Sequence, residues 1–376
     1  MRLHLTDQRL ARRCLAWLMR ERLLAGLMLL ALLLACVDPR APSAWLDWLE
    51  WPTLTGLTGL MAAIQGISDS GWTQRGAETL LPRFHSVRGV GLALVVASAL
   101  LATVLTNDVS LFLMVPLTLA LGHHERLPVA RLVILEALAV NAGSMLSPIG
   151  NPQNLLIWQH SGLSFTAFVA AMLPATLIVF ALTVLLARLW LPPRPVASGH
   201  VPMPVAHHGR GLLAVAALVG MVPAMQYGHP LIGMCGVLAA FAVGARACLR
   251  RMDWGLLLTF AVIFVTLGHL SVWPPLVHLL DHFDLDQSLS LYLAGIVGSQ
   301  VISNVPATVL LLEHTHAPMA LAVAVNVGGA GCVIGSLANL IAVRLARGQV
   351  TMWQFHRVAV PFLLVSAVLV YLLTSA

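Results

Sequence analysis

Residues 141–155 read NAGSMLSPIGNPQNL, and residues 326–340 read NVGGAGCVIGSLANL. Aligned without a gap, the two stretches agree at six of fifteen positions and are 185 residues apart. Self-similarity at a fixed distance predicts an internal duplication. The shared positions are Asn141/Asn326, Gly143/Gly328, Ile149/Ile334, Gly150/Gly335, Asn154/Asn339 and Leu155/Leu340.

A second polar element precedes each stretch. The sequence Thr106-Asn107-Asp108 interrupts one apolar run, and Ser303-Asn304-Val305 interrupts another. The chain has only seven asparagines, and six of them form pairs between the two halves. Asparagine is typical of surface turns, yet here it lies within apolar runs. The pattern therefore predicts paired interruptions of helices.

The composition places these interruptions in a membrane. Of 376 residues, 59% are hydrophobic and 10% are charged, and the mean hydropathy is +0.88. Apolar runs of about twenty residues, enough to cross a bilayer as a helix, recur along the chain. The net charge of +6 comes from arginines in loops and at the N-terminus, which is typical of topology signals and not of nucleic-acid binding. The five cysteines form no CxxC motif, so no transition-metal site is predicted.

The arginine-bearing loops predict the path of the chain through the bilayer. We expect an all-α polytopic membrane protein with about nine spanning helices, two of them broken, and two re-entrant hairpins. The hairpins cover about 89–121 and 288–312, and the broken helices cover about 131–160 and 318–345. The first repeat spans 1–190, a cytoplasmic linker and connecting helix span 191–230, and the second repeat spans 231–376. Because the connecting helix crosses once, the second repeat is predicted to be inverted, with the N-terminus cytoplasmic and the C-terminus periplasmic.

Helix breaks inside a bilayer need a chemical partner. Backbone N–H and C=O groups left bare in lipid cost several kcal/mol each, so breaks persist around a polar cavity or a ligand. The N-termini of half-helices attract anions, and the carbonyl groups at their C-terminal ends suit Na⁺ or a protonated carrier. A simpler interpretation is that Gly and Pro only kink helices. It explains one isolated break better than four breaks in two inverted pairs.

The predicted site combines short polar side chains at the hairpin tips and at the breaks. Such side chains can donate to a substrate oxygen without carrying net charge. The predicted substrate-binding residues are Thr106, Asn107, Ser303, Asn304, Asn154 and Asn339. The predicted coupling-ion residues, for Na⁺ or H⁺, are Asp108, Asn107, Ser147, Gly150, Asn151, Asn304, Gly335 and Ser336.

Two carboxyl groups lie within the predicted membrane segments. A carboxylate such as that of Asp108 costs free energy near the middle of the bilayer, and such residues mark ion or proton handling. The counterpart of Asp108 in the second half is Val305. The alternative is that Asp108 caps the second half-helix of its hairpin. Glu136 lies near a membrane boundary, where we expect it to reach water and to have no role in transport.

The motifs TNDVSLFLMVPL, SPIGNPQN and ISNVPATVL resemble those of the ion transporter superfamily, which includes divalent anion:sodium symporters, the arsenite permease ArsB and NhaD-type antiporters. The resemblance spans about residues 50–345 and is closest to YbiR-type inner-membrane transporters. It implies a transport domain of hairpins and broken helices that moves against a scaffold, often in a homodimer. In the anion symporters, Ser-Asn-Thr at each tip binds a substrate carboxylate. Here Asp108 and Val305 replace the threonines, which is more similar to the arsenite and antiporter branches.

The sequence thus predicts an ion-coupled secondary active transporter of the bacterial inner membrane that moves a small anion or oxyanion and uses no cofactor. The first alternative is a sodium/proton antiporter that uses Asp108. An intramembrane enzyme is a remote alternative, because the sequence contains no Ser-His or paired-carboxylate constellation at membrane depth and no nucleotide-binding loop. The expected partners are a small anionic solute, the lipid bilayer and a second copy of the chain, with no nucleic acid.

Overall fold

The computed structural model describes residues 22–80, 83–124, 127–196, 206–280, 285, 287–312 and 314–374. Every regular element within these ranges is a helix. The chain divides into unit 1, Met1–Leu54 with Asp253–His282, and unit 2, Thr55–Met252 with Phe283–Ala376. The basic N-terminal stretch and part of the predicted linker lie outside the described residues. The predicted repeat boundaries are a different division and stay a prediction.

Several helices have the length and apolar composition of membrane spans. A helix rises about 1.5 Å per residue, so 18 residues cover about 27 Å, close to the thickness of a hydrocarbon core. Among the described residues, five helices meet this requirement: α6 (Val87–Val104), α10 (Phe165–Trp190), α11 (His208–Gln226), α14 (Trp254–Ser271) and α20 (Met352–Thr374). Five further helices are apolar over stretches of 10–17 residues: α2 (Arg22–Val37), α7 (Asn107–His124), α12 (Pro230–Gly244), α16 (Ser288–Ile302) and α18 (Pro318–Gly329).

The length of helix α6 fits a full crossing of the membrane as well as the predicted re-entrant path. We expected it to be the first arm of a re-entrant hairpin, but it is itself long and apolar enough to cross a membrane. The number of nine spans and the re-entrant path therefore stay predictions. What the helices establish is an all-helical membrane protein.

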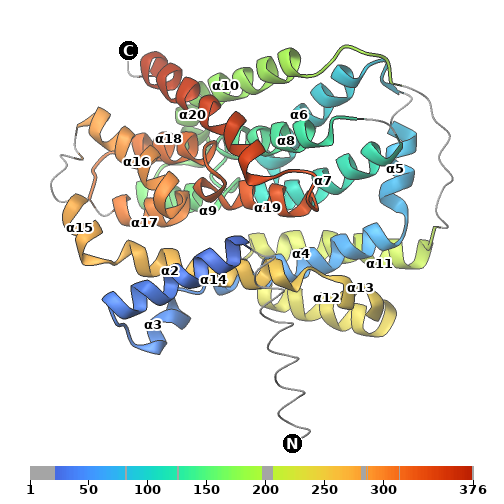
Figure 1. The fold of residues 1–376 in the computed structure, drawn as a ribbon, viewed down its shortest axis with the longest axis horizontal. Helices are drawn as coiled ribbons and strands as arrows, with labels where there is room; N and C mark the ends of the chain where they lie inside the picture. Colours follow the sequence, from blue (N-terminus) through green and yellow to red (C-terminus); the bar gives the residue numbers. More distant parts are fainter. Residues whose placement is uncertain are drawn as a thin grey trace, which may run out of the picture. The chain divides into compact units, whose positions relative to one another are not determined.

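Unit 1 is built around the pair α2 and α14, which contact each other (Figure 1). Two short helices, α3 (Pro42–Asp47) and α15 (Pro274–Leu280), complete it. Gly268 lets α14 approach the loop after α3, because a Cβ there would lie 2.6 Å from Trp48 Cγ. The indole of Trp48 also stacks on the ring of His269, with 5.0 Å between the ring centroids.

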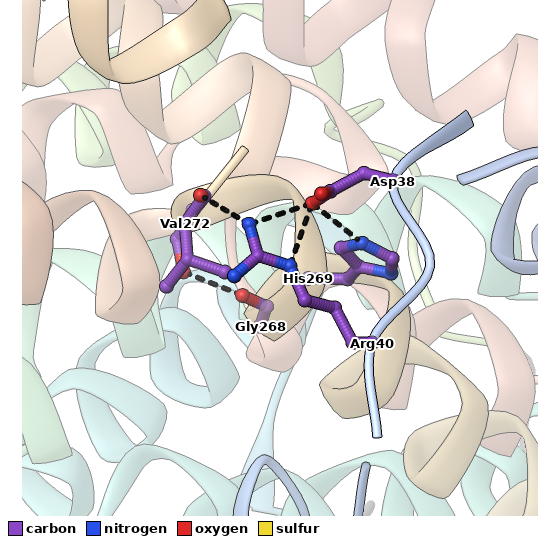
Figure 2. Close-up of polar contacts among 6 residues, drawn as sticks. Asp38, Arg40, Gly268, His269 and Val272 are labelled. Carbon is purple, nitrogen blue, oxygen red and sulfur yellow. Dashed lines mark hydrogen bonds and ion pairs between the residues drawn. The ribbon is translucent and has the colours of Figure 1, made fainter. Parts of the chain in front are cut away.

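A polar cluster joins the C-terminal ends of α2 and α14 (Figure 2). Arg40 donates from Nε to Asp38 Oδ2 at 2.8 Å, and His269 Nε2 lies 3.2 Å from the same oxygen. The hydrogen bond from Arg40 holds the pKa of Asp38 below its usual value, and His269 adds to this effect against the desolvation of the carboxylate. The cluster fixes where the chain leaves α2 and where α14 ends.

Part of unit 2 comprises α4 (Trp51–Asp69) from Thr55 onward, α5 (Trp72–Leu80), α11, α12 and α13 (Arg246–Arg251). All of these helices except α13 contain glycine. The glycines let α4 approach α11 closely, since a Cβ at Gly59 would lie 2.4 Å from Met221 Sδ. A Cβ at Gly66 would likewise lie 2.6 Å from the ring of Phe241 on α12.

The rest of unit 2 contains four interrupted helices, at the positions where the sequence predicts breaks. The first pair is α6 and α7 around Leu105–Thr106, and the second is α16 and α17 (Asn304–Leu312) around Ser303. The third pair is α8 (Val129–Ser144) and α9 (Pro152–Ser161). The fourth is α18 and α19 (Leu337–Leu345), with the 3₁₀ turn η2 (Val333–Gly335) between them. We call residues 145–151 the first break and residues 330–336 the second break.

The interrupted helices exchange partners reciprocally. Within one half α6 contacts α8, and within the other α16 contacts α18. Between the halves, α8 contacts α19 while α18 contacts α9, and α7 contacts α19 while α17 contacts α9 (Figure 1). Such an exchange of equivalent elements is what a two-fold relation produces.

Candidate functional site

The two breaks are joined by two equivalent hydrogen bonds between asparagines. Asn141 Nδ2 donates to Asn339 Oδ1 at 2.7 Å, and Asn326 Nδ2 donates to Asn154 Oδ1 at 2.6 Å. The donors lie near the ends of α8 and α18, and the acceptors lie near the starts of α19 and α9. Each half therefore supplies one donor to the other half and receives one in return.

Each acceptor asparagine also closes its own break. Asn154 Nδ2 donates to Ser144 O at 3.3 Å and to Ser147 O at 3.0 Å. Asn339 Nδ2 donates to the equivalent carbonyls, Gly329 O at 2.8 Å and Cys332 O at 3.0 Å. Ser144 and Gly329 end α8 and α18, where carbonyl groups have no partner within the helix, and Ser147 and Cys332 lie inside the breaks.

Asn151 and Ser336 occupy equivalent positions and combine two roles. Asn151 Oδ1 caps α9 by accepting from Asn154 N at 2.9 Å, and its Nδ2 donates to Asn326 Oδ1 at 2.9 Å. Ser336 Oγ accepts from Ala338 N at 3.3 Å and donates to Asn141 Oδ1 at 3.1 Å. We call these six side chains the asparagine network. None is more than 5% exposed: Asn141, Asn151, Asn154, Asn326, Ser336 and Asn339.

Each hairpin tip lies against the break of its own half. Asn107 N donates to Gly150 O at 2.9 Å, which attaches the first tip to the first break. At the second tip, Asn304 Nδ2 lies 3.1 Å from the position that a Cβ on Gly329 would occupy. The last helical turns before the two tips also make equivalent hydrogen bonds. Thr103 Oγ1 on α6 donates to Gly143 O at 3.0 Å, and Gln300 Nε2 on α16 donates to Gly328 O at 2.6 Å.

Ser303 holds the second tip in a strained backbone conformation. Its φ of 70° and ψ of 156° belong to a region that only glycine adopts readily. A non-glycine residue there costs on the order of 1–3 kcal/mol, and such strain concentrates at functional sites. The first tip turns over two residues, Leu105 and Thr106, and does not use a positive φ.

The predicted site residues thus gather around both breaks. The asparagine network connects the two breaks, and each tip contacts one of them. Among the described residues, no hydrogen bond joins the two tips directly. Ser147 Oγ accepts from Ile149 N at 3.2 Å, and Gly335 N donates to Cys332 O at 2.9 Å within the second break. Both polar atoms of Asn154 and of Asn339 are engaged within the protein, so in this structure they hold the breaks.

The two buried carboxyl groups bear on two sequence-based interpretations, the capping role of Asp108 and the contact of Glu136 with water. Asp108 is 6% exposed, and its Oδ1 has no hydrogen-bond partner. Thr106 Oγ1 accepts from Val109 N at 3.4 Å, so the bond that caps α7 comes from Thr106 and the capping interpretation of Asp108 is not supported. Glu136 was expected to reach water, which is wrong. It is fully buried, accepts a hydrogen bond from the Thr118 hydroxyl, and leaves its Oε2 without a partner.

The second break depends on two side chains that the sequence analysis missed. Gln300 Oε1 accepts from Cys332 N at 2.7 Å, and His356 Nε2 accepts from Val333 N at 2.9 Å. Gln300 stands at the position equivalent to Thr103, so aligning the two hairpins could have found it. His356 comes from α20, and no pattern in the sequence connects it with the break.

Two cavities open near the start of α8. One has a volume of about 390 Å³ and includes Leu119, Pro128, Arg131 and Gln349 in its lining. The other, of about 330 Å³, includes Ile134, Trp190 and Arg357. No predicted site residue lines either cavity. The first cavity brings Gln349, which follows α19, beside the residues that begin α8.

Residues 14–317 match the protein family described as citrate transporter, CitMHS. The sequence is 40% identical to the inner membrane protein YbiR of Escherichia coli over 355 residues, which cover 94% of this chain and 95% of that protein. It is 30% identical to an uncharacterized transporter of Methanocaldococcus jannaschii over 70% of this chain and 73% of the relative. A shorter segment of 106 residues, 28% of this chain and 20% of the relative, is 33% identical to the silicon efflux transporter LSI3 of rice.

Proposed function

The chain belongs to the citrate transporter family of membrane transporters, and from this premise we propose that it moves a small anion or oxyanion across the inner membrane. Transport is active, is coupled to Na⁺ or H⁺, and proceeds by alternating access. The observation that carries the proposal is the reciprocal exchange of hydrogen bonds between Asn141 and Asn339 and between Asn326 and Asn154.

The proposed architecture is a pair of inverted repeats. The position of Gln349, which follows α19, beside the start of α8 and the exchange of partners between halves support it. In this arrangement the hairpins α6–α7 and α16–α17 enter from opposite sides of the bilayer. The N-terminus is cytoplasmic and the C-terminus periplasmic. The transporter works as a homodimer.

The proposed substrate site lies at the tips. Four half-helices begin at the interruptions, namely α7, α9, α17 and α19. Helix N-termini carry partial positive charge and unpaired N–H groups, which favour an anion. Thr106, Asn107, Ser303 and Asn304 contact the substrate, and Asn154 and Asn339 keep the breaks open around it.

The proposed coupling site uses Asp108 with the first break. Asp108 has a buried carboxylate oxygen without a partner, which a proton or a sodium ion would satisfy. The other contributors are Asn107, Ser147, Gly150, Asn151, Asn304, Gly335 and Ser336.

Uptake by proteoliposomes tests the substrate site. The panel contains citrate, after the family description, together with silicate and arsenite as oxyanions, each with an imposed sodium or proton gradient. We expect Asn107→Ala and Asn304→Ala to reduce uptake at least tenfold while the protein stays folded. Val104→Ala and Val301→Ala are matched controls near each tip, because both valines are more than half exposed. Unchanged uptake in both asparagine variants would refute the site.

A second candidate function is sodium/proton antiport through Asp108, favoured by the unpartnered Oδ1 of that residue. A sodium pulse applied to vesicles loaded with a pH dye separates the two functions. Proton movement without any anion, abolished in Asp108→Asn, supports the antiporter. Proton movement that requires an anion supports the symporter.

A further inference from the structure

The second break contains a backbone N–H that its counterpart in the first break lacks. Val333 aligns with Pro148, and proline has no N–H to satisfy. The Val333 N–H lies in a residue that is only 1% exposed, so water does not replace a missing partner. This one amide therefore needs an acceptor from elsewhere in the protein.

The acceptor is the imidazole of His356 in α20, with 2.9 Å between Val333 N and His356 Nε2. Because Nε2 accepts, it carries no proton, and the proton of the neutral ring is on Nδ1. A protonated imidazole is a donor at both nitrogens and has no acceptor. The Val333 bond and a proton on Nε2 therefore exclude each other.

Few charged groups surround this histidine. Phe355 lies edge-on to its ring, and Arg357 lies over the ring of Trp353. The elements that pack against α20 are α8, α10, α18 and η2. Their charged residues are Arg131, which donates to Trp190 O, Glu136, which is bonded to Thr118, and Arg188, which is exposed. Among the described residues, none of these groups forms an ion pair with His356.

We propose that His356 is a proton-binding site whose occupancy opens the second break. An incoming proton takes the Nε2 lone pair, the Val333 N–H loses its acceptor, and the turn from Cys332 to Gly335 is released from α20. Gln300 continues to hold the Cys332 amide, so only one of the two external supports is removed. Histidine ordinarily changes charge between about pH 5 and 8. The inference rests on the proposed function only in treating the second break as part of the transport site.

Amide hydrogen exchange of the purified full chain, followed by mass spectrometry, tests the proposal. Peptides covering 330–336 and 145–151 are compared at pH 8 and pH 5 after correction for intrinsic exchange rates. In the wild type we expect protection of 330–336 to fall roughly fivefold at pH 5, the equivalent of about 1 kcal/mol for one hydrogen bond. Protection of 145–151, where Pro148 stands, is expected to stay constant.

Two variants separate proton binding from a merely structural contact. His356→Gln places an oxygen acceptor near the position of Nε2 and does not titrate, so 330–336 should stay protected at both pH values. His356→Asn does not reach the amide, so protection should be low at both. A wild-type protein without a pH effect, or a His356→Gln variant that follows the wild type, would overturn the proposal.

The exchange experiment contains no substrate, so its result is independent of anion uptake. If uptake fails and the pH effect on 330–336 is present, the proposed substrate is wrong and the proton site stands. If uptake succeeds and the pH effect is absent, the proton site is wrong and the transport function stands.

Discussion

The first break and the second break make the same hydrogen bonds to each other but satisfy their remaining groups differently. In the first, Pro148 removes an N–H and Ser147 accepts from Ile149. In the second, Gln300 and His356 supply acceptors from other helices. The buried acids also occur in the first half only, because the residues equivalent to Asp108 and Glu136 in the second half are Val305 and Leu321. The two halves share the bonds that join them and differ in the chemistry around those bonds.

The largest effect is expected for the bonds that the two breaks share. Asn339→Ala removes three buried hydrogen bonds, to Gly329 O, to Cys332 O and from Asn141 Nδ2. Cys332 O still accepts from Gly335 N and Asn141 Nδ2 still donates to Ala137 O, so these two losses cost about 1 kcal/mol each, whereas the loss at the Gly329 carbonyl costs about 1–3 kcal/mol. The expected loss of unfolding free energy is therefore about 3–5 kcal/mol. Asn154→Ala is expected to cost a similar amount, because its bonds are equivalent. Thermal unfolding in detergent measures both, and an Asn339→Ala variant as stable as the wild type would contradict the comparison.

A smaller difference is expected where helices cross at glycine. A Cβ at Gly143 would lie 2.0 Å from the backbone oxygen of Ala99, whereas a Cβ at Gly328 would first meet the Ser299 side chain at 2.7 Å. Backbone yields less than a side chain, so Gly143→Ala should cost about 3 kcal/mol and Gly328→Ala about 1 kcal/mol. The same unfolding measurement checks this, and a reversed order would show that α16 and α18 are the more rigid pair.

Replacing the strained tip residue should stabilise one half only. Ser303→Gly removes the strain of a positive φ and should raise the unfolding free energy by about 1 kcal/mol. Thr106→Gly relieves no such strain and should lower it by about 0.5–1 kcal/mol. Ser303→Ala removes the hydroxyl but keeps the positive φ, so it measures the contribution of the hydroxyl alone. Equal destabilisation by both glycine substitutions would mean that Ser303 is not strained.

The smallest effect on stability is expected for the buried acid on α8. Glu136→Leu installs the residue that the second half has at this position, Leu321. Replacing a buried ionisable group with an apolar one of similar size is often neutral or stabilising, here by up to about 1 kcal/mol. Glu136→Gln keeps the acceptor for Thr118 and serves as the control. A loss above about 2 kcal/mol in Glu136→Leu, with Glu136→Gln unaffected, would assign the carboxyl a structural role.

The positions of the interruptions could be predicted from the sequence because they follow from local chemistry. Gly150 and Pro152 cannot continue a regular helix inside an apolar run, and Asn107 and Asn304 follow a Thr or Ser at each tip. The helix bounds agree with the expected ones within a few residues, for example α8 and α9, which together span 129–161 where a broken helix was expected at about 131–160. Short helices such as α5 (WTQRGAETL) contain no apolar run and were not predicted.

The contacts within the site could not be predicted, because they depend on how distant helices are oriented. The sequence paired Asn141 with Asn326 as equivalent residues, but the structure shows that each bonds the other half's second asparagine. Burial of Glu136 depends on the helices that pack around α8, which position along the chain does not reveal. The acceptor role of His356 has the same origin, since α20 lies outside every repeated motif.

The crossed asparagine bonds also limit how this gene can change over time. A residue that serves only its own half can be replaced alone, as Pro148 and Val333 illustrate. A substitution at Asn141 removes a hydrogen-bond partner from Asn339 in the other half. Neither residue can therefore change without a compensating change in the other half. This mutual dependence applies to four of the seven asparagines of the chain, Asn141, Asn154, Asn326 and Asn339.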